Sequence, residues 1–578
     1  MSKTTQVDTG RRKRVASTVL VVLLVVAALA VCACSGSTPT LKDEVEVPTS
    51  SYVSLDTETR ARVDEALLVT KDTDADPLAR AEAYLYVSDI NLLMWDEVHR
   101  KIELLDESQG DQFKQLQSAG RVYFMQAHRA RSRSWAARAE VDSKYVKVGA
   151  YEKRFKEAWE HYNEPATAFE ELSQLLSETI TAKQNQYVDV DFLSDLRYST
   201  AIFYTLQARP AGDMAGILTI CQGDEAEAVR FAGDIAYLYD KLVAQPETAA
   251  DTYRAIAKAN PQTREGYEAQ VAVLDALRKR QRAGAMEQGS SDSFDTSSEG
   301  LKLFETVNQD LGVLVEMNAN KETWRDKDVD GGNTDARAEE LVRSFTVRMH
   351  GLAQQQKNKT LYELAASAYE KYHLLFPNSG YAYEMLYLHA EVLYTLERYD
   401  GAFEHYKEAL GTAPQGKYRK EILKALVMAA HKRCASVPLP SSPPDARVDM
   451  PEVHRDFIGA GEQFISSLGD SDPDMAGYVR YEIIIRHVLY GETRVAEPLL
   501  EDMVKFDSSH AQAPKAAITW LEVLAREAIK GDDRDTRALE RAIERIRSTS
   551  SLMSDQGVRD KLDQVSGAKP NLSGIIPR

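Results

Sequence analysis

The sequence is poor in the residues that interrupt or cross-link a fold. Of its 578 residues, 30 are glycine, 19 are proline and 4 are cysteine. So few helix breakers exclude a chain dominated by loops, and four cysteines over this length exclude a disulfide-built scaffold or a multi-cysteine zinc module. Two of them, Cys221 and Cys434, lie in the body of the chain. We expect both to be buried free thiols, and a single bridge between them stays open in an oxidising compartment.

Positive charge is also in short supply. The chain has 71 lysine and arginine residues against 89 aspartate and glutamate residues, which gives a formal net charge of -18. A nucleic-acid partner would need a basic surface, and so would electrostatic binding to anionic lipid. The charge therefore argues against both functions and favours a protein partner with a basic surface.

Sequence signatures of catalysis and metal binding are missing as well. The eleven histidines show no HExxH or other paired spacing, and His389 and His405 are expected at the surface or between helices. The stretch "DKDVDGGNTDAR" (326–337) begins like a calcium loop, but Arg337 stands where a bidentate carboxylate is required. We expect a solvated loop there. The sequence predicts no catalytic residue, metal or cofactor, and no small-molecule substrate.

The N-terminus has the pattern of an export signal. Basic residues 11–14 precede the apolar run Val15–Val31, and "VCAC" follows. This end resembles the bacterial lipobox, with an aliphatic residue at minus three and a small residue before the acylated cysteine, here Cys34. The resemblance implies cleavage after residue 33 and lipidation of Cys34. An uncleaved signal anchor stays open, because the run is near the shortest length that spans a bilayer.

The residue after Cys34 bears on location. Lipoproteins kept at the inner membrane often carry aspartate at this position, whereas this chain has Ser35. The resemblance therefore implies an outer-membrane lipoprotein that faces the periplasm, with inner-membrane anchoring as the alternative.

The rest of the chain is dominated by helical periodicity. Apolar residues recur at steps of three and four over most of its length, which predicts an all-α fold. Pro-, Ser- and Gly-rich stretches separate the helical segments. The predicted organisation is a signal peptide (1–33), a flexible tether (34–58), an N-terminal helical-repeat region (59–283), a flexible joint (284–300), a repeat core (301–435), a Pro-rich loop (436–451), degenerate repeat-like helices (452–552) and a C-terminal tail (553–578).

One pattern repeats at a fixed distance within the core. Residues 353–377 align with residues 390–414 at an offset of 37, which is typical of stacked helical units. The aligned pairs are Ala353 with Ala390, Tyr362 with Tyr399, Ala365 with Ala402, Tyr369 with Tyr406, and Pro377 with Pro414.

The residue types in this pattern have a steric reason. Small side chains at Ala390 and Ala402 let two helices approach, and Tyr406 projects between neighbouring pairs as a large knob. Ala409 leaves room for the next unit. Pro414 ends the second helix, because it lacks an N–H donor and clashes with the preceding turn. The same signature occurs once more, at Ala249, Tyr253 and Pro261.

These positions resemble the tetratricopeptide (TPR) repeat. Counted from Tyr383, the small residues fall at its eighth and twentieth positions, Tyr406 at its twenty-fourth and Pro414 at its thirty-second. The resemblance implies a solenoid of helical hairpins in a right-handed superhelix, with a concave surface for binding. The spacing of 37 is similar to that of outer-membrane TPR lipoproteins of envelope machineries. A weaker similarity is to the TPR lipoprotein of the myxobacterial gliding machinery.

The function that follows is a scaffold rather than an enzyme. We expect a lipid-anchored protein that binds other proteins in a bacterial envelope complex, such as a gliding or other trans-envelope machine. One alternative is an accessory lipoprotein of outer-membrane protein assembly or of cell-wall machinery. Another is an enzyme with an unrecognised site in residues 59–229. Most of the 27 tyrosines are expected to pack between helices, and some to line the groove.

Overall fold

The structure is a computed structural model. It describes residues 55–105, 110–141, 148–183, 188–210, 212–287, 298–320, 331–444, 446–529 and 533–567. The predicted signal peptide, Cys34 and most of the predicted tether lie outside these residues.

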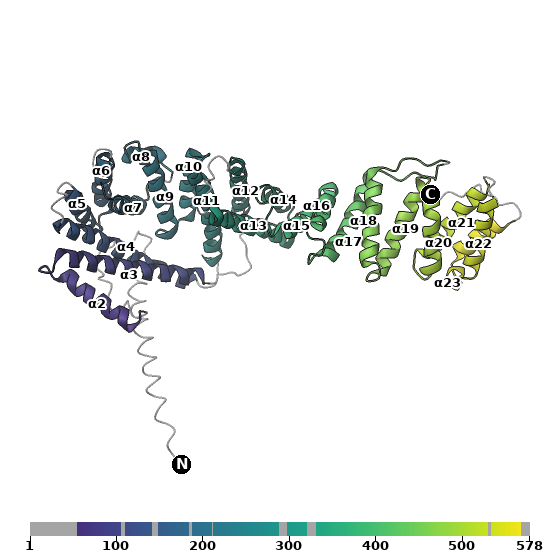
Figure 1. Cartoon of the computed structure of the whole chain (residues 1–578), viewed down its shortest axis with the longest axis horizontal. Coiled ribbons are helices and arrows are strands. Elements are labelled where there is room, and N and C mark those ends of the chain that lie inside the picture. The colour runs from purple at the N-terminus through teal and green to yellow at the C-terminus, as the bar shows by residue number, and fades with distance from the viewer. Residues whose placement is uncertain are drawn as a thin grey trace, which may run out of the picture. The chain divides into compact units, whose positions relative to one another are not determined.

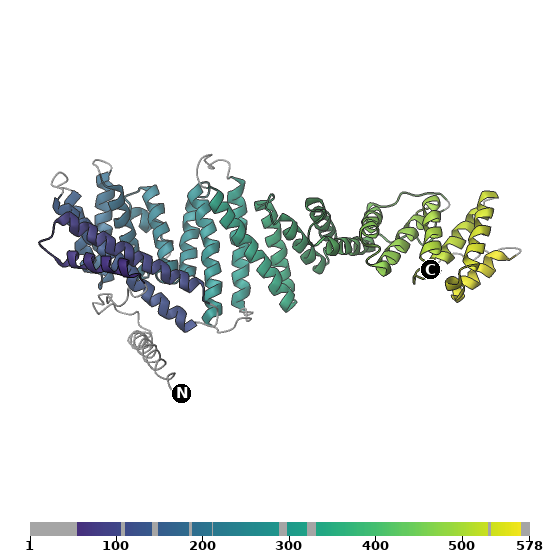
Figure 2. The same ribbon diagram turned by 60° about the horizontal axis from the view of Figure 1, so that its bottom comes forward.

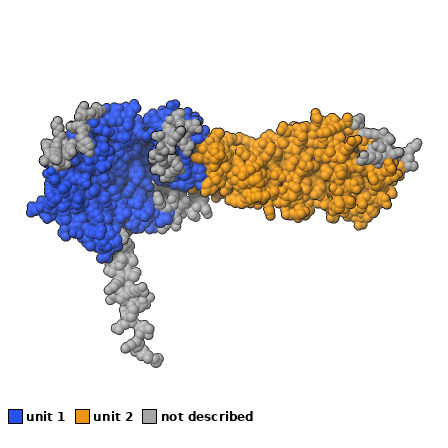
Figure 3. All heavy atoms as spheres, viewed as in Figure 1, with its two compact units in different colours: residues 1–345 blue, residues 346–578 orange. Residues whose placement is uncertain are grey.

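Within the described residues the chain is all-helical and contains no strand, which confirms the predicted fold class. None of the described helices is long and apolar enough to cross a membrane. The chain divides into two compact units, Met1–Phe345 and Thr346–Arg578 (Figure 3).

Unit 1 contains the first eleven of the described helices and the start of the next. They are α2 (Thr57–Lys71), α3 (Pro77–Glu103), α4 (Gly110–Val141), α5 (Val148–Glu160), α6 (Pro165–Lys183), α7 (Val190–Leu206), α8 (Met214–Ile220), α9 (Glu225–Lys241), α10 (Pro246–Ala259), α11 (Arg264–Glu287), α12 (Ser298–Ala319) and the first part of α13 (Gly331–Gln356).

Unit 2 contains the rest of α13 and the helices that follow. They are α14 (Lys359–Leu375), α15 (Ala382–Thr395), α16 (Tyr399–Thr412), α17 (Arg419–Arg433), the 3-10 turn η4 (Cys434–Ser436), α18 (Glu452–Leu468), α19 (Pro473–Leu489), α20 (Thr493–Phe506), α21 (Ala513–Ile529), α22 (Asp533–Arg547), α23 (Ser550–Met553) and α24 (Gln556–Ser566).

Many of these helices begin at a residue that favours a helix start. The side chains of Asp76, Asp224, Asn358 and Asp472 each accept a hydrogen bond from a backbone N–H of the first turn. Such caps satisfy donors that have no partner inside the helix, and each contributes about 1 kcal/mol. Helix starts are therefore encoded locally in the sequence.

Turns within hairpins share one backbone conformation. Ala244, Lys357, Glu397 and Gly491 each follow the end of a helix and have a positive φ, between 50° and 76°. In three of these turns the next residue donates its N–H to a carbonyl five positions earlier, as Arg398 does to Leu393 at 2.8 Å. This is the Schellman arrangement, which ends a helix and reverses the chain within a few residues.

In unit 1 the long helices α3 and α4 lie across α7 and α9 (Figures 1 and 2). From α3, Trp95 packs against Tyr237 of α9, with ring centroids 6.4 Å apart. From α4, Phe124 and His128 pack against Tyr198 of α7 at 6.1 and 5.0 Å. Aromatic side chains of α7 and α9 are therefore in contact with helices of the same unit, although Tyr237 remains 36% exposed.

In unit 2 each helix packs against the next along the chain. A core near its C-terminal end joins α20 to α24 through buried side chains such as Leu500, Leu521, Ile546 and Leu562. Helix α24 lies inside the segment predicted as a C-terminal tail, and its apolar face (Val558, Leu562, Val565) is buried. Likewise α11 extends to Glu287 and α12 begins at Ser298, so the described helices take up both ends of the predicted joint.

Candidate protein-binding surface

The alanines of the repeat signature are all completely buried. Ala353, Ala365, Ala390, Ala402 and Ala409 each have a relative exposure of 0%. A side chain larger than alanine at these positions would meet neighbouring helices, because protein interiors are close-packed. The small residues therefore lie where helices approach each other most closely.

The two tyrosines of the signature are equally buried and hydrogen-bonded. Tyr369 has an exposure of 0% and Tyr406 of 1%. The Tyr369 hydroxyl lies 3.1 Å from Nδ1 of His350, and the Tyr406 hydroxyl donates to the carboxylate of Glu391. Burial raises the pKa of both phenols, and Glu391 raises that of Tyr406 further. Each ring thus fills the interior while its hydroxyl has a polar partner.

The three signature prolines occupy one structural position. Pro261, Pro377 and Pro414 each lie two residues beyond the last residue of a helix. The residues before them, Asn260, Phe376 and Ala413, have φ between -140° and -129° and ψ between 52° and 83°. Proline keeps the preceding residue out of the helical region, so the same residue ends the helix in the same way in both units.

The remaining signature residues are less buried. Tyr362, Tyr399 and Tyr253 are half-buried, whereas Ala249 in unit 1 is buried completely. Tyr399 is the first residue of α16, and its ring packs edge-on against Tyr394 at 5.3 Å. These tyrosines are therefore contact residues near the surface and not core knobs.

Three half-buried tyrosines form a stack on α15 and the start of α17. The ring of Tyr418 lies 4.6 Å from that of Tyr387 and 6.2 Å from that of Tyr383, both nearly parallel. The Tyr383 hydroxyl accepts the Tyr418 N–H at 2.9 Å. A Cβ at Gly416 would lie 2.2 Å from the Tyr383 ring, so only glycine fits beneath it. The backbone and the rings therefore fix this stack together.

Carboxylates surround the stack. Glu384 accepts from the Tyr418 hydroxyl at 2.9 Å. Burial, and then Glu391 and Glu421, raise the pKa of Tyr387 to about 12. We call these six residues the tyrosine face: Tyr383, Tyr387, Tyr418, Glu384, Glu391 and Glu421.

The tyrosine face already holds a cation of its own chain. The Lys417 ammonium lies 4.5 Å from the Tyr418 ring centroid and 3.2 Å from a Glu384 oxygen. Aromatic faces and carboxylates both attract ammonium and guanidinium groups. With Glu391 and Glu421 alongside, the surface is chemically suited to lysine or arginine side chains.

Three histidines are stacked beside the repeat signature. His373, His389 and His405 come from α14, α15 and α16, and their ring centroids lie 4.3 to 5.6 Å apart. His389 is 1% exposed, and neither of its ring nitrogens has a hydrogen-bond partner. Burial, together with positive neighbours, lowers the pKa of His389 to about 2 and that of His373 to about 4. The interior therefore holds neutral imidazoles. His389 was expected at the surface or between helices, and it packs between helices.

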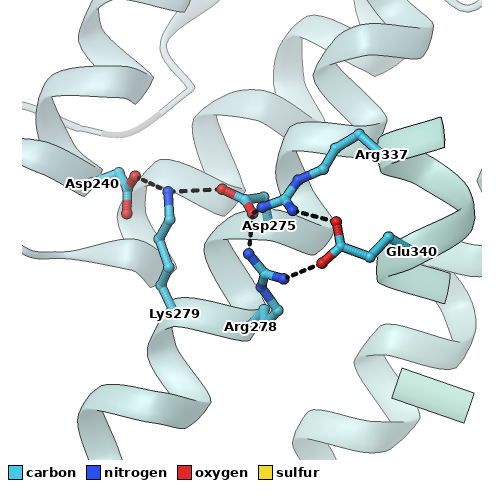
Figure 4. Close-up of polar contacts among 6 residues, drawn as sticks. All are labelled: Asp240, Asp275, Arg278, Lys279, Arg337 and Glu340. Atoms are coloured by element: carbon cyan, nitrogen blue, oxygen red, sulfur yellow. Dashed lines mark hydrogen bonds and ion pairs between the residues drawn. The ribbon is translucent and has the colours of Figure 1, made fainter. Parts of the chain in front are cut away.

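Unit 1 contains a network of six charged residues from α9, α11 and α13 (Figure 4). Lys279 lies between Asp240 at 2.6 Å and Asp275 at 2.7 Å. Arg337, which stands where a calcium loop would need a carboxylate, pairs with Asp275 and with Glu340 at 2.7 Å. The sixth residue, Arg278, pairs with the same two carboxylates. Three cations and three carboxylates balance, so the network joins helices and leaves no charge uncompensated.

The two cysteines in the body of the chain are both unreactive. Cys221 and Cys434 are free and buried, and burial raises the pKa of Cys221 to about 12. Such a thiol stays protonated at neutral pH and is a weak nucleophile. Among the described residues no group of three or more His, Cys, Asp or Glu side chains is placed to hold a metal ion.

Comparison with known protein families and with curated proteins finds no match for this chain. A functional proposal therefore has to rest on the residues of this chain and their geometry. Sequence patterns indicated the buried alanines and tyrosines but not the tyrosine face or the histidine stack. A signal for the stack was present, since its histidines follow one another at intervals of 16 residues.

Proposed function

We propose that the chain is a lipid-anchored, periplasm-facing TPR scaffold that binds a basic segment of a partner protein in a bacterial envelope complex. The observation that supports it best is the tyrosine face. Its rings stack on one another, the Tyr383 hydroxyl accepts the Tyr418 N–H, and the Lys417 ammonium lies against the Tyr418 ring and the Glu384 carboxylate. The net charge of -18 would steer a basic partner towards the chain.

Binding by this surface is tested with a peptide of alternating lysine and serine residues. We expect the peptide to bind the full chain and to dissociate as salt is added, because exposed charges are screened. The double variant Glu391→Gln, Glu421→Gln should weaken binding about tenfold, a loss of about 1.4 kcal/mol.

A matched control comes from α16. The double variant Glu404→Gln, Glu408→Gln removes the same charge from side chains that are 61% exposed and outside the tyrosine face. Equal weakening by both double variants would mean that only net charge matters, and the proposed site would be wrong.

The anchor is tested separately. Mass spectrometry of the mature protein should find Cys34 as the first residue, carrying diacylglycerol and an acylated amine. Cys34→Ala should release the protein from the membrane fraction. An intact Met1 or an unmodified Cys34 in the mature protein would refute the anchor and leave the tyrosine face as a separate question.

A further inference from the structure

Unit 2 contains a pocket of about 830 Å³ between the Pro-rich loop and helices α19 and α21. Its helical wall combines six aliphatic side chains with polar and charged ones, and loop residues 439–443 form the opposite wall. Pockets of this volume are large enough for a ligand or several residues of a peptide. The aliphatic lining from α19 and α21 comprises Ile485, Val488, Leu489, Ile518, Val523 and Ile529.

The charged groups of the pocket are mostly engaged. Glu482 accepts from Arg486 at 2.8 Å, and Glu522 accepts from Lys561 at 2.7 Å. Lys515 also lines the pocket, and the described residues give it no ion pair. Lys515 is therefore a hydrogen-bond donor available at this pocket, beside the hydroxyls of Ser441, Ser442 and Thr493, whereas the two carboxylates already form ion pairs.

One side of the pocket already binds a proline-containing segment of the chain itself. Arg526 lines the pocket and donates from its two Nη atoms to the carbonyls of Pro443 and Pro444, at 2.9 Å each. Proline has no N–H, so a proline segment needs donors for its carbonyls but no acceptors. The loop thus lies against α21 without orphaned donors.

We propose that this pocket binds an extended, proline-rich segment of a partner protein, laid beside the chain's own segment 439–444. The pocket continues the contact that Arg526 and the loop already make. Aliphatic walls suit proline and leucine side chains, and Lys515 supplies a donor for a further carbonyl. A segment with free N–H groups would need acceptors, and the two carboxylates of the pocket already form ion pairs with residues of the chain.

Proline-rich segments also lose little entropy on binding, because their extended conformation is preformed. The inference rests on the proposed scaffold function in one respect, that this chain binds segments of other proteins. It concerns a different surface from the tyrosine face and a different ligand chemistry.

The test uses the full chain and a fluorescent peptide with the sequence Pro-Leu-Pro-Pro-Leu-Pro-Pro-Leu-Pro. We expect saturable binding, at least about tenfold tighter than that of the same peptide with every proline replaced by serine. Ile485→Glu should weaken binding about tenfold or more, because it places a charge in the aliphatic wall. Ile529→Glu places a charge at the edge of the pocket. Because the Ile529 side chain is 59% exposed, we expect the fold to tolerate this substitution.

Val495→Glu is the matched control, since Val495 is 46% exposed on α20 and does not line the pocket. It should leave binding unchanged. Equal binding of the serine peptide, or binding that neither pocket variant weakens, would overturn the proposal. So would a dimer of the chain that Ile485→Glu dissociates while the peptide fails to bind, since the pocket would then belong to a second copy.

The lysine–serine peptide is measured on the same samples. If it binds and the proline peptide does not, the inference about the pocket is wrong and the proposed scaffold function stands. If neither binds, the scaffold function fails as well.

Discussion

The aromatic residues of the two units have different neighbours. In unit 1 Tyr198 of α7 packs against Phe124 and His128, and Tyr237 of α9 packs against Trp95 while remaining 36% exposed. In unit 2 the stack of Tyr383, Tyr387 and Tyr418 is half-buried and bordered by carboxylates. The same residue type is thus in contact with aromatic rings of the long helices α3 and α4 in one unit, and is bordered by carboxylates in the other.

Charge follows the same division. The network around Asp275 in unit 1 balances three cations with three carboxylates. The tyrosine face has three carboxylates and Lys417 as the cation bound to it. Compensated charge stabilises a fold, whereas uncompensated charge is available to a partner.

The largest effect is expected from removing a buried knob. Tyr406→Ala leaves a cavity in unit 2 and an acceptor without its donor, and should cost about 3–5 kcal/mol of unfolding free energy. Tyr253→Ala, at the equivalent signature position in unit 1, removes a half-buried ring and should cost about 1–2 kcal/mol. Urea unfolding measures both. Equal losses would show that the signature packs alike in the two units.

Acid should destabilise unit 2 through its histidine stack. The folded-state pKa values of His373 and His389 are depressed, to about 4 and about 2, so the unfolded chain binds more protons below its pKa of about 6.5. Stability is therefore full above pH 6.5 and falls as the pH is lowered through this range. Each buried histidine should cost about 2 kcal/mol between pH 7 and pH 5.

His389→Leu isolates this contribution, and it should reduce the loss between pH 7 and pH 5 by about 2 kcal/mol. Thermal unfolding at the two pH values measures it. An unchanged pH dependence in the variant would mean that His389 is not a buried neutral imidazole.

The ion-pair network should contribute to the stability of unit 1. Asp275→Asn removes the carboxylate shared by Arg278, Lys279 and Arg337, whose side chains are 31–37% exposed. We expect this variant to lose about 1.5 kcal/mol of unfolding free energy, a value between those of exposed and of buried ion pairs. Glu408→Gln in unit 2, where the carboxylate is 61% exposed, is the control and should be nearly neutral. Urea unfolding that shows no loss for Asp275→Asn would contradict the assigned role.

The smallest effect is expected from the hairpin turns, which have the same backbone conformation in both units. Glu397 and Ala244 have φ of 60° and 56°, a region that glycine adopts without strain. Glu397→Gly and Ala244→Gly should each stabilise the chain by about 0.5–1 kcal/mol, measured as a higher Tm. Destabilisation by either variant would show that the turn has another conformation in solution.

Sequence reasoning succeeded where one residue type has one physical role. The helical period predicted the all-α fold, and prolines such as Pro377 and Pro414 marked helix ends because proline excludes the helical conformation before it. The tyrosine face was not predictable in this way, since a tyrosine can be a knob or a surface. Tyr383 and Tyr387 lie on α15 and Tyr418 directly precedes α17, and only the fold brings the three rings together.

The pocket was beyond sequence reasoning for a similar reason. Arg526 and Pro443 are 83 residues apart, and neither carries a local signal of the other. The packing of α3 on α9 likewise depends on contacts across more than 100 residues, such as that of His99 with the Lys241 carbonyl. Local sequence patterns predict where helices lie, whereas contacts between distant residues decide which helix faces are buried.

The most direct test of this difference is photocrosslinking in cells, with a photoreactive residue placed at Tyr387 in one variant and at Tyr198 in another. We expect position 387 to capture a partner at a lysine- or arginine-rich segment, and position 198 to crosslink only to neighbouring helices of its own chain. A partner captured from position 198, or none captured from position 387, would contradict this expectation.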